Sequence, residues 1–347
     1  MPAGSWRSYG NVCRLEAGAP RDGTRPQGNL RMDDRERLAW LGLCWGAEIG
    51  PAGFARVLAT YGSAGAALAA DEADLVHGEA RLKEPQAAAI QRVRHTLDSF
   101  GRLAEQVRGN GAHVYFSPDE DYPEALRELP HPPPVVCVKG RLLPVDMLAV
   151  GIVGTRSPTD EGADMATKLA TAAAADEFTV VSGLARGVDT AAHLGALHRE
   201  GRTIALIGSG IANVTPPENE ELAERIAATG AVISELSPVA PPTIPNLMAR
   251  NRLISLLSRG VIVVECRATG GSLATAQAAL HQGRRLYAVQ WPAQDELREG
   301  NAHLLAQGAE PIAGPQDMRR VGIQLRTWEH PAGAPDEAHE RPQLSLF

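Results

Sequence analysis

The sequence has few cysteines, few aromatic residues and no long apolar run. Its four cysteines lie far apart, and no C-x-x-C pair occurs among Cys13, Cys44, Cys137 and Cys266. This spacing indicates neither a zinc site nor a disulfide framework, so we expect no metal and a reducing compartment. The chain contains no stretch of about 18 apolar residues, and its first residues lack the apolar run of a signal peptide. We therefore expect a cytoplasmic protein with no membrane segment.

The charge balance limits what the whole surface can bind. The 34 Lys and Arg residues are outnumbered by 41 Asp and Glu residues, which gives a formal net charge of −7. An acidic surface does not coat a polyanion, so any nucleic-acid site must be local. Only 4% of the 347 residues are aromatic, and alanine is plentiful. This length and composition predict about two domains with a helix-rich α/β architecture.

Two nucleotide-binding signatures are also absent. No G-x-x-x-x-G-K-[ST] sequence occurs, so no triphosphate with magnesium is held in the P-loop manner. The first glycine-bearing turn lacks G-x-G-x-x-G, and no acidic residue follows the next strand at the position that would bind a ribose. Dinucleotide binding is disfavoured, and we expect no cofactor.

The beginning of the chain divides into two predicted segments. Residues 1–31 are rich in Gly, Pro and Arg, which predicts a disordered extension. Met32 precedes an acidic helix start, so it is a candidate translation start, with a genuine disordered tail as the alternative. Apolar residues then recur at helical spacing, which predicts a small all-helical domain over 32–110. Its turn at Gly50-Pro51 is typical of a helix-hairpin-helix, which binds phosphates through backbone N–H groups, or of a simple helix connector.

After residue 111, short β-branched runs alternate with helical stretches. Strands are expected at 112–116, 135–138, 147–153, 179–182, 203–208, 231–234, 261–265 and 286–289. Helices are expected at 161–174, 190–199, 218–228, 247–257 and 272–282. This alternation predicts a parallel, doubly wound sheet over 111–315. Residues 316–347 lose the rhythm and are predicted to form a flexible tail.

Glycine-bearing turns follow four of the expected strands. They are Gly154-Thr155-Arg156, Ser182-Gly183-Leu184-Ala185-Arg186-Gly187, Gly208-Ser209-Gly210 and Gly270-Gly271-Ser272. The carboxyl ends of parallel strands meet at one edge of the sheet, so these turns predict a phosphate-binding pocket there. Six arginines between residues 246 and 285, opposed only by Glu265, predict a patch that accepts phosphates, with scattered surface arginines as the alternative.

The ordered motifs resemble those of the DNA-processing protein A family (DprA, also called Smf). The similarity extends over about residues 111–312. The matching stretches are Tyr122-Pro123-x-x-Leu126, Val138-x-Gly140, Gly154-x-Arg156, Ser182-Gly183-Leu184-Ala185-Arg186-Gly187-x-Asp189-x-x-Ala192-His193, Pro217-x-Asn219, Ser234-Glu235, Arg250-Asn251-Arg252-x-Ile254, Val264-Glu265, Gly271-Ser272-Leu273-x-Thr275-Ala276 and Gly283-Arg284. The resemblance implies an extended Rossmann-like fold with a mostly parallel sheet, preceded by a helical domain of the SAM or helix-hairpin-helix type.

The resemblance also implies a function and a set of site residues. It implies a non-catalytic protein that binds and protects single-stranded DNA and loads a RecA-type recombinase during natural transformation and recombination, as a homodimer. The implied DNA-binding residues are Gly154, Thr155, Arg156, Ser182, Gly183, Arg186, Gly187, Arg250, Asn251, Arg252, Gly271 and Ser272. Arginine suits this role because it is permanently charged and donates to phosphate in bidentate fashion.

This chain departs from the family pattern at three places. Leu247 and Thr215 stand where relatives often have aromatic residues, and Gln290-Trp291 stands where they often have Pro-Gly. Losing aromatic platforms would weaken base stacking. Trp291 would restore a stacking surface or, as a residue just after a strand, pack in the interior.

The last five residues resemble the bacterial sliding-clamp-binding motif. Gln343 would anchor the peptide, and Leu344, Leu346 and Phe347 would fill an apolar groove on the clamp. The alternative is a tail that folds back on its own domain.

The rival function is a nucleotide-binding or nucleotide-hydrolysing Rossmann-like enzyme. Such an enzyme needs a carboxylate poised in the pocket, and Glu265 is the one obvious candidate. Asp189 and His193 lie four residues apart, but Asp189 suits a helix cap and His193 has no nucleophile at a matched spacing. We therefore expect binding without turnover.

Overall fold

The structure is a computed structural model of the chain, and it describes residues 32–292 and 295–329. The predictions for residues 1–31 and for the Gln343–Phe347 peptide lie outside these ranges. The described residues belong to one compact unit. No helix within the described part is long and apolar enough to cross a bilayer.

The first part of the unit is helical. Its α-helices are α1 (Asp34–Leu41), α2 (Pro51–Tyr61), α3 (Ala64–Ala69), α4 (Glu72–His77), α5 (Glu84–Val93) and α6 (Leu97–Gly109), with a short π-helix at Gly42–Gly46 after α1. Asp33 caps α1 by accepting a hydrogen bond from the backbone N–H of Glu36 at 2.8 Å. Pro51 occupies the first turn of α2, where no backbone N–H is needed.

The second part is built on a nine-stranded sheet. Its strands are β1 (Ala112–Phe116), β2 (Val135–Gly140), β3 (Ala149–Val153), β4 (Thr179–Ser182), β5 (Thr203–Leu206), β6 (Ala231–Ser234), β7 (Gly260–Val263), β8 (Arg285–Val289) and β9 (Glu310–Ile312). Their spatial order is β1-β2-β6-β5-β4-β3-β7-β8-β9. The pairs β1–β2 and β2–β6 are antiparallel and all other pairs are parallel. The predicted mostly parallel Rossmann-like sheet is confirmed.

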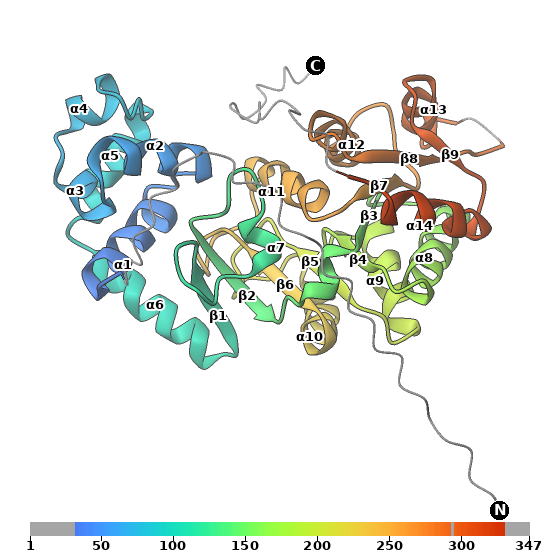
Figure 1. Cartoon of the computed structure of the whole chain (residues 1–347), viewed down its shortest axis with the longest axis horizontal. Helices are drawn as coiled ribbons and strands as arrows, with labels where there is room; N and C mark the ends of the chain where they lie inside the picture. Colours follow the sequence, from blue (N-terminus) through green and yellow to red (C-terminus); the bar gives the residue numbers. More distant parts are fainter. Residues whose placement is uncertain (1–31, 293–294, 330–347) are drawn as a thin grey trace, which may run out of the picture. The chain divides into compact units, whose positions relative to one another are not determined.

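Helices cover both faces of this sheet (Figure 1). They are α7 (Glu124–Arg127), α8 (Asp160–Ala175), α9 (Val188–His198), α10 (Glu220–Thr229), α11 (Ile244–Leu256), α12 (Gly271–His281), α13 (Glu299–Ala306) and α14 (Met318–Arg326). Strand β3 shows why two layers form. Val150 and Ile152 join the core that contains α8, α9 and α14, whereas Ala149 and Val153 join the core that contains α11 and α12. Alternate side chains of a strand point to opposite faces, so a fully apolar strand needs cover on both.

The flexible tail predicted from residue 316 is wrong for its first part. Residues Met318–Arg326 form α14, whose Val321 and Leu325 are fully buried. Arg259 holds the end of this helix, because its guanidinium donates to the carbonyls of Leu325 and Arg326 at 3.1 and 3.2 Å. The alternation of strand and helix patterns did not reveal this helix, because α14 is short and has one narrow apolar stripe. Strand β9 was missed because it has three residues and contains Pro311.

Candidate nucleic-acid interface

The site is the edge of the sheet where the central parallel strands end. We define the carboxyl rim as the loops after β3, β4 and β7, residues 154–159, 183–187 and 264–271. The chain passes outward from β3 through β4, β5 and β6, then crosses back to β7, β8 and β9. The β3–β7 boundary is thus the topological switch point, where open α/β sheets bind ligands.

The loop after β3 is fixed at both ends by its neighbours. The backbone N–H of Thr155 donates to the carbonyl of Glu265 at 2.7 Å, and the N–H of Val188 donates to the carbonyl of Thr155 at 3.1 Å. A Cβ on Gly154 would lie 2.6 Å from Cγ2 of Val188. The loop therefore has a defined shape, and glycine is required where it touches α9.

Arg156 stands at the tip of this loop. Its side chain is exposed, and within the described ranges it makes no hydrogen bond or ion pair. A guanidinium with five free donors on a fixed backbone is ready to accept a phosphate. A phosphate that binds Arg156 displaces no carboxylate, in contrast to Arg186 and Arg267 on the neighbouring loops, which pair with glutamates.

The loop after β4 packs directly against the first loop. Gly187 has a φ of +77°, and a Cβ there would lie 2.5 Å from the carbonyl oxygen of Thr155. The Ser182 hydroxyl donates to the carbonyl of Ile152 at 2.6 Å, so it serves the strand end and not a ligand. The Asn219 side-chain amide donates to the carbonyl of Leu184 at 2.9 Å. The motif Pro217-x-Asn219 thus stabilises the β4 loop through a side chain that lies outside the rim segments.

Arg186 lies beside Gly187 but has a partner. Its guanidinium pairs with Glu218, and the side chains are 63% and 49% exposed. An ion pair this exposed is screened by water and contributes little to stability. Arg186 can therefore exchange its carboxylate for a phosphate at small cost.

Arg250 lies beneath the rim and not on it. It is 6% exposed, and its guanidinium donates to the carbonyls of Gly183 and Leu206. Its pKa is lowered to about 10, mainly by burial; Asp189 opposes this shift, and nearby Arg156 adds to it. A Cβ on Gly183 would lie 2.5 Å from Oδ2 of Asp189 and 2.8 Å from the Arg250 guanidinium. The prediction that Arg250 contacts DNA directly is therefore disfavoured by its position, which suits a support for the β4 loop.

Asp189 is the buried counter-charge of Arg250. Burial raises the pKa of its carboxyl, and the main opposing effect is the charge of Arg250. Its Oδ2 accepts a hydrogen bond from the N–H of Ala185 at 3.2 Å. Asp189 thus fixes the β4 loop, whereas the sequence suggested a helix cap.

His193 is a buried, neutral part of the same region. Burial lowers its pKa to about 3, and Nδ1 lies 2.7 Å from the Thr203 hydroxyl. An imidazole that is buried, bonded to Thr203 and hard to protonate is poorly suited to act as a general base near neutral pH.

The segment after Arg250 reaches the third rim loop. The Asn251 side-chain amide donates to the carbonyl of Gly271 at 3.1 Å. Gly271 and Ser272 begin α12, which has no side-chain cap, and residues 267–271 are exposed. The free N–H groups of this helix start favour an anion. Arg252 pairs with Glu235, and both side chains are about one-fifth exposed.

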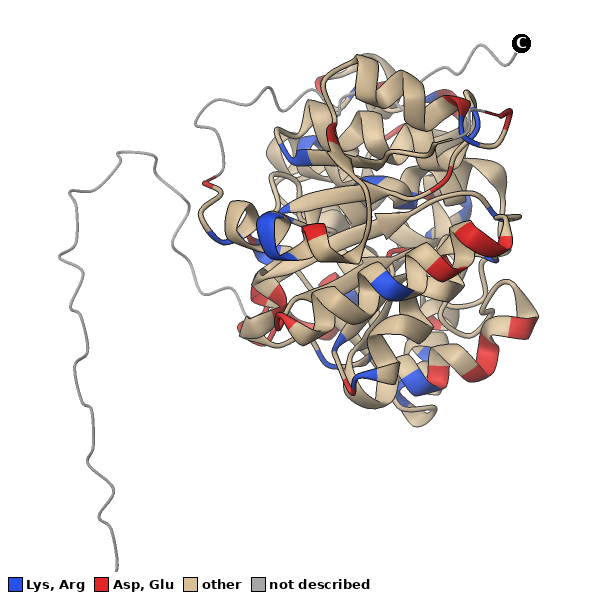
Figure 2. Cartoon of the chain, turned by 90° about the vertical axis from the view of Figure 1, so that its right-hand side faces the viewer, with Lys and Arg blue, Asp and Glu red and all other residues tan. Residues whose placement is uncertain are grey.

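The six arginines predicted as one phosphate patch are dispersed by the fold. Arg252, Arg267 and Arg285 pair with Glu235, Glu296 and Glu310, whereas Arg250, Arg259 and Arg284 donate to backbone carbonyls. Figure 2 shows the same intermixing, with Lys and Arg next to Asp and Glu across the face in view. Arg267 is the exception that faces solvent, at 48% exposure, on the loop after β7. Its place just past a strand end was the signal that would have added it to the site.

The switch point itself is filled by the protein's own side chains. The fully buried carboxylate of Glu265 accepts hydrogen bonds from the N–H and hydroxyl of Thr159 at 2.8 and 3.0 Å and from Nε of Arg298 at 3.0 Å. Gly162 leaves room for it, because a Cβ there would lie 2.5 Å from Oε2 of Glu265. This carboxylate occupies the start of α8, the position that holds a nucleotide phosphate in Rossmann folds. Glu265 is therefore not a poised catalytic group, and the rival hydrolase loses its candidate.

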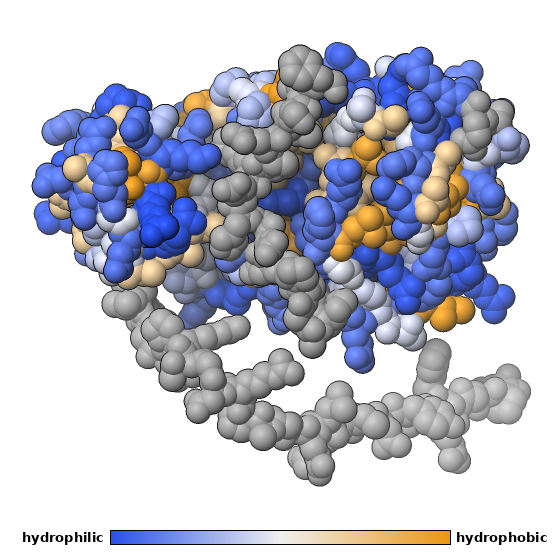
Figure 3. All heavy atoms as spheres, turned by 90° about the horizontal axis from the view of Figure 1, so that it is seen from above, coloured by the Kyte–Doolittle hydropathy of each residue, from blue (hydrophilic) through white to orange (hydrophobic). Residues whose placement is uncertain are grey.

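The structure also locates the third glycine turn and two departures from the family pattern, Leu247 and Trp291. Gly208 is buried, and a Cβ on it would lie 2.7 Å from Cα of Leu247, so that turn is covered by α11. Trp291 is buried, and its indole donates to the carbonyl of Val264 at 2.8 Å. The packing role of Trp291 is confirmed. On the face seen in Figure 3, apolar residues form separate small patches between hydrophilic ones.

The fold and the rim together define a Rossmann-like α/β protein with exposed arginines at the carboxyl edge of its sheet and a helical domain before the sheet. The family model described as DNA recombination-mediator protein A matches residues 113–321, and that of the DprA-like N-terminal HHH domain matches residues 34–90. The chain belongs to the DNA recombination-mediator protein A (DprA/Smf) family.

Individual relatives agree with this membership. The chain is 40% identical to Protein Smf of Synechocystis over 232 residues, 65% of this chain and 57% of that protein. It is 38% identical to the DNA processing protein DprA of Streptococcus pneumoniae, over 58% of this chain and 71% of that protein. It therefore spans only part of the length of these relatives.

Two solved structures resemble the fold. The X-ray structure of DprA from Streptococcus pneumoniae aligns with a TM-score of 0.65 at 27% identity, covering 86% of this chain and 99% of that one. DprA from Helicobacter pylori, whose title names a single-stranded DNA binding mode, aligns with a TM-score of 0.55 at 29% identity, covering 61% and 96%.

Proposed function

We propose that this chain binds single-stranded DNA along the carboxyl rim and presents it to a RecA-type recombinase during transformation and recombination. The observation that carries the proposal is Arg156, an exposed arginine without an ionic partner on a loop fixed by Glu265 and Val188. Arg186 and Arg267 flank it on the neighbouring loops, each with an exposed carboxylate that a phosphate can replace. The exposed start of α12 adds backbone donors.

The arrangement supports binding without cleavage. Among the described residues, no group of three or more His, Cys, Asp or Glu side chains could hold a metal ion. Glu265 is committed to Thr159 and Arg298, and His193 stays neutral in the interior. We expect labelled oligonucleotides to remain intact when they are incubated with the protein.

The direct test is the salt dependence of binding. Three rim arginines on three phosphates predict that log K falls against log salt with a slope of about −2, since each contact on a single strand contributes about −0.7. Arg156→Ala should reduce the steepness by about 0.7 and weaken binding about fivefold at roughly 0.1 M salt. The matched control is Arg102→Ala, which removes an exposed arginine from α6, remote in sequence from the rim. Fluorescence anisotropy with labelled oligo-dT measures both quantities. Equal slopes for the two variants would refute the role of Arg156.

The partner proposals need separate measurements. If the protein loads RecA, it should speed the formation of RecA filaments on strands already covered by a single-strand binding protein. The Arg156→Ala variant should not speed it. The homodimer is tested by sedimentation equilibrium. Clamp binding through Gln343, Leu344, Leu346 and Phe347 is tested by titrating the clamp with the peptide 341–347. The absence of saturable binding would refute this proposal.

A further inference from the structure

A cavity lies far from the carboxyl rim, at the antiparallel end of the sheet. Its volume is about 280 Å³, and it is lined by His113, Tyr115, Asp121, Pro123, Val138, Arg141 and Leu142. Strand β1 is separated from β4 by β2, β6 and β5, which puts it roughly 20 Å away along the sheet. Gly140, the last residue of β2, pairs with Ala231, the first residue of β6, so Arg141 belongs to the edge opposite the rim. None of the residues assigned to DNA binding lines this cavity.

Two aromatic rings form one side of the cavity. His113 and Tyr115 are two residues apart on β1 and therefore share a face of the sheet. Their ring centroids are 5.8 Å apart and their planes are tilted by 31°. Buried Val138 on the neighbouring strand extends this surface. Two neighbouring aromatic rings of this kind offer a stacking surface to a planar ring system.

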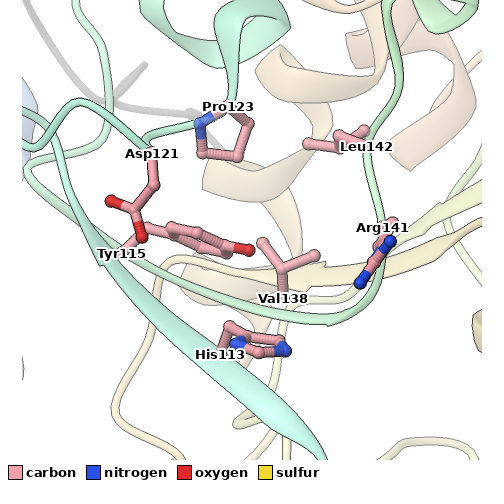
Figure 4. A pocket seen from close by; sticks show the side chains of 7 residues that line it. All are labelled: His113, Tyr115, Asp121, Pro123, Val138, Arg141 and Leu142. Carbon is pink, nitrogen blue, oxygen red and sulfur yellow. The ribbon is translucent and has the colours of Figure 1, made fainter.

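Two opposite charges face each other across these rings. Figure 4 shows Asp121 and Arg141 on opposite sides of the cavity, with Tyr115 and His113 below and Pro123 and Leu142 above. Neither charged side chain has a hydrogen-bond or ionic partner among residues 32–292 and 295–329. Burial raises the pKa of the Tyr115 phenol, Asp121 raises it further, and Arg141 opposes them. Both charges therefore lie close enough to the Tyr115 ring to influence its phenol.

The walls of the cavity are held in place before any ligand arrives. Arg127 donates to the carbonyls of Ser117 and Tyr122 at 3.0 and 3.2 Å, which fixes the loop that carries Asp121. The buried Tyr122 hydroxyl donates to the carbonyl of Pro133 at 2.8 Å. On the other side, the N–H of Arg141 donates to the carbonyl of Gly230 at 2.8 Å. A preformed site avoids the entropy cost of ordering its loops on binding.

We propose that this cavity binds a single nucleotide, with the base stacked on Tyr115 and His113, the base N–H groups donating to Asp121, and the phosphate held by Arg141. The volume lies just below the usual range for ligand pockets, which suits one base and its sugar and not a dinucleotide. Asp121 accepts hydrogen bonds only, so it favours bases with an exocyclic amino group. Thymine offers one N–H between two carbonyls and should bind more weakly. The same chemistry occurs in a free nucleotide and in an unpaired base of a DNA strand.

The test is calorimetric titration of the full chain with the four 2′-deoxynucleoside 5′-monophosphates. We expect saturable binding that is weakest for the thymidine nucleotide. Tyr115→Ala and His113→Ala should each weaken it about fivefold or more, through loss of stacking. His113 is exposed, so its substitution leaves the core untouched. Asp121→Asn should abolish the preference against thymine, and Arg141→Gln should weaken binding where the matched control Arg102→Gln does not.

A second arm separates the two sources of the nucleotide and keeps this proposal independent of the rim. A deoxyadenylate oligomer carrying 8-azidoadenine is irradiated with the protein, and the labelled peptide is located by mass spectrometry. Label within residues 112–116 supports a base of the DNA strand, whereas nucleotide binding without such label supports a free nucleotide. The loss of binding caused by Tyr115→Ala should be the same in an Arg156→Ala background, which separates this cavity from any nucleotide bound at the rim. The proposal is overturned if no monophosphate saturates below about 10 mM, or if binding survives intact in both Tyr115→Ala and His113→Ala.

Discussion

Replacing Arg250 separates a support for the rim from a contact with DNA. Arg250→Met keeps an unbranched apolar stem and removes the guanidinium with its charge. It leaves the carbonyls of Gly183 and Leu206 without their donor and the buried Asp189 carboxylate without its counter-charge. Each buried carbonyl left without its donor costs about 1–3 kcal/mol. A protein whose stability is about 10 kcal/mol, in the middle of the ordinary range, stays folded at room temperature after this loss.

The assay joins stability to binding. Urea unfolding followed by circular dichroism should show the midpoint fall in proportion to this loss, since the free energy of unfolding varies linearly with denaturant. The salt slope of oligo-dT binding should stay at the wild-type value, because no phosphate contact is lost. Adding Asp189→Asn removes the unpaired carboxylate and should recover about 1–3 kcal/mol, the size of a direct coupling. The reasoning fails if Arg250→Met keeps wild-type stability within about 1 kcal/mol and reduces the salt slope by about 0.7.

Three further predictions follow from the same contacts. Glu218→Gln removes the carboxylate that competes with phosphate for Arg186, so oligo-dT binding measured by anisotropy should tighten while its salt slope stays at about −2, because the number of phosphate contacts is unchanged; weaker binding would show that the pair holds the loop. Gly187→Ala should lower DNA affinity and stability more than its control Gly62→Ala, because both glycines have φ near +78° but nothing lies within 4 Å of a Cβ at Gly62; equal losses would exclude the steric argument. The pKa of His193 is about 3 in the folded protein, so below about pH 6.5 the unfolded chain binds a proton that the folded protein does not. This difference should lower the free energy of unfolding by about 2 kcal/mol between pH 7 and pH 5. His193→Gln should flatten that decline, and an unchanged decline in urea midpoints would contradict the buried, neutral assignment.

The sheet was readable from the sequence because its signals are local. Runs such as Thr179–Ser182 and Ala231–Ser234 are continuous, β-branched and bounded by turns, so their ends were predicted without error. The site was only partly readable. Gly154 and Gly187 mark a close approach of two loops, and Arg156 stands at the tip between them. Nothing in the local sequence distinguished Arg156, which faces solvent, from Arg250, which is buried.

The sequence by itself determined that strands and helices alternate, that glycine turns follow the strands and that arginines lie near those turns. Only the tertiary structure decided which arginines remain available. Each decisive partner is distant along the chain: Glu218 lies 32 residues from Arg186, Gly183 lies 67 from Arg250, and Glu265 lies 106 from Thr159. Hydrogen bonding and burial depend on distance in space, and a charge at the surface or in the interior obeys opposite energetics. The same residue type therefore serves as a ligand contact at one position and as a buried brace at another.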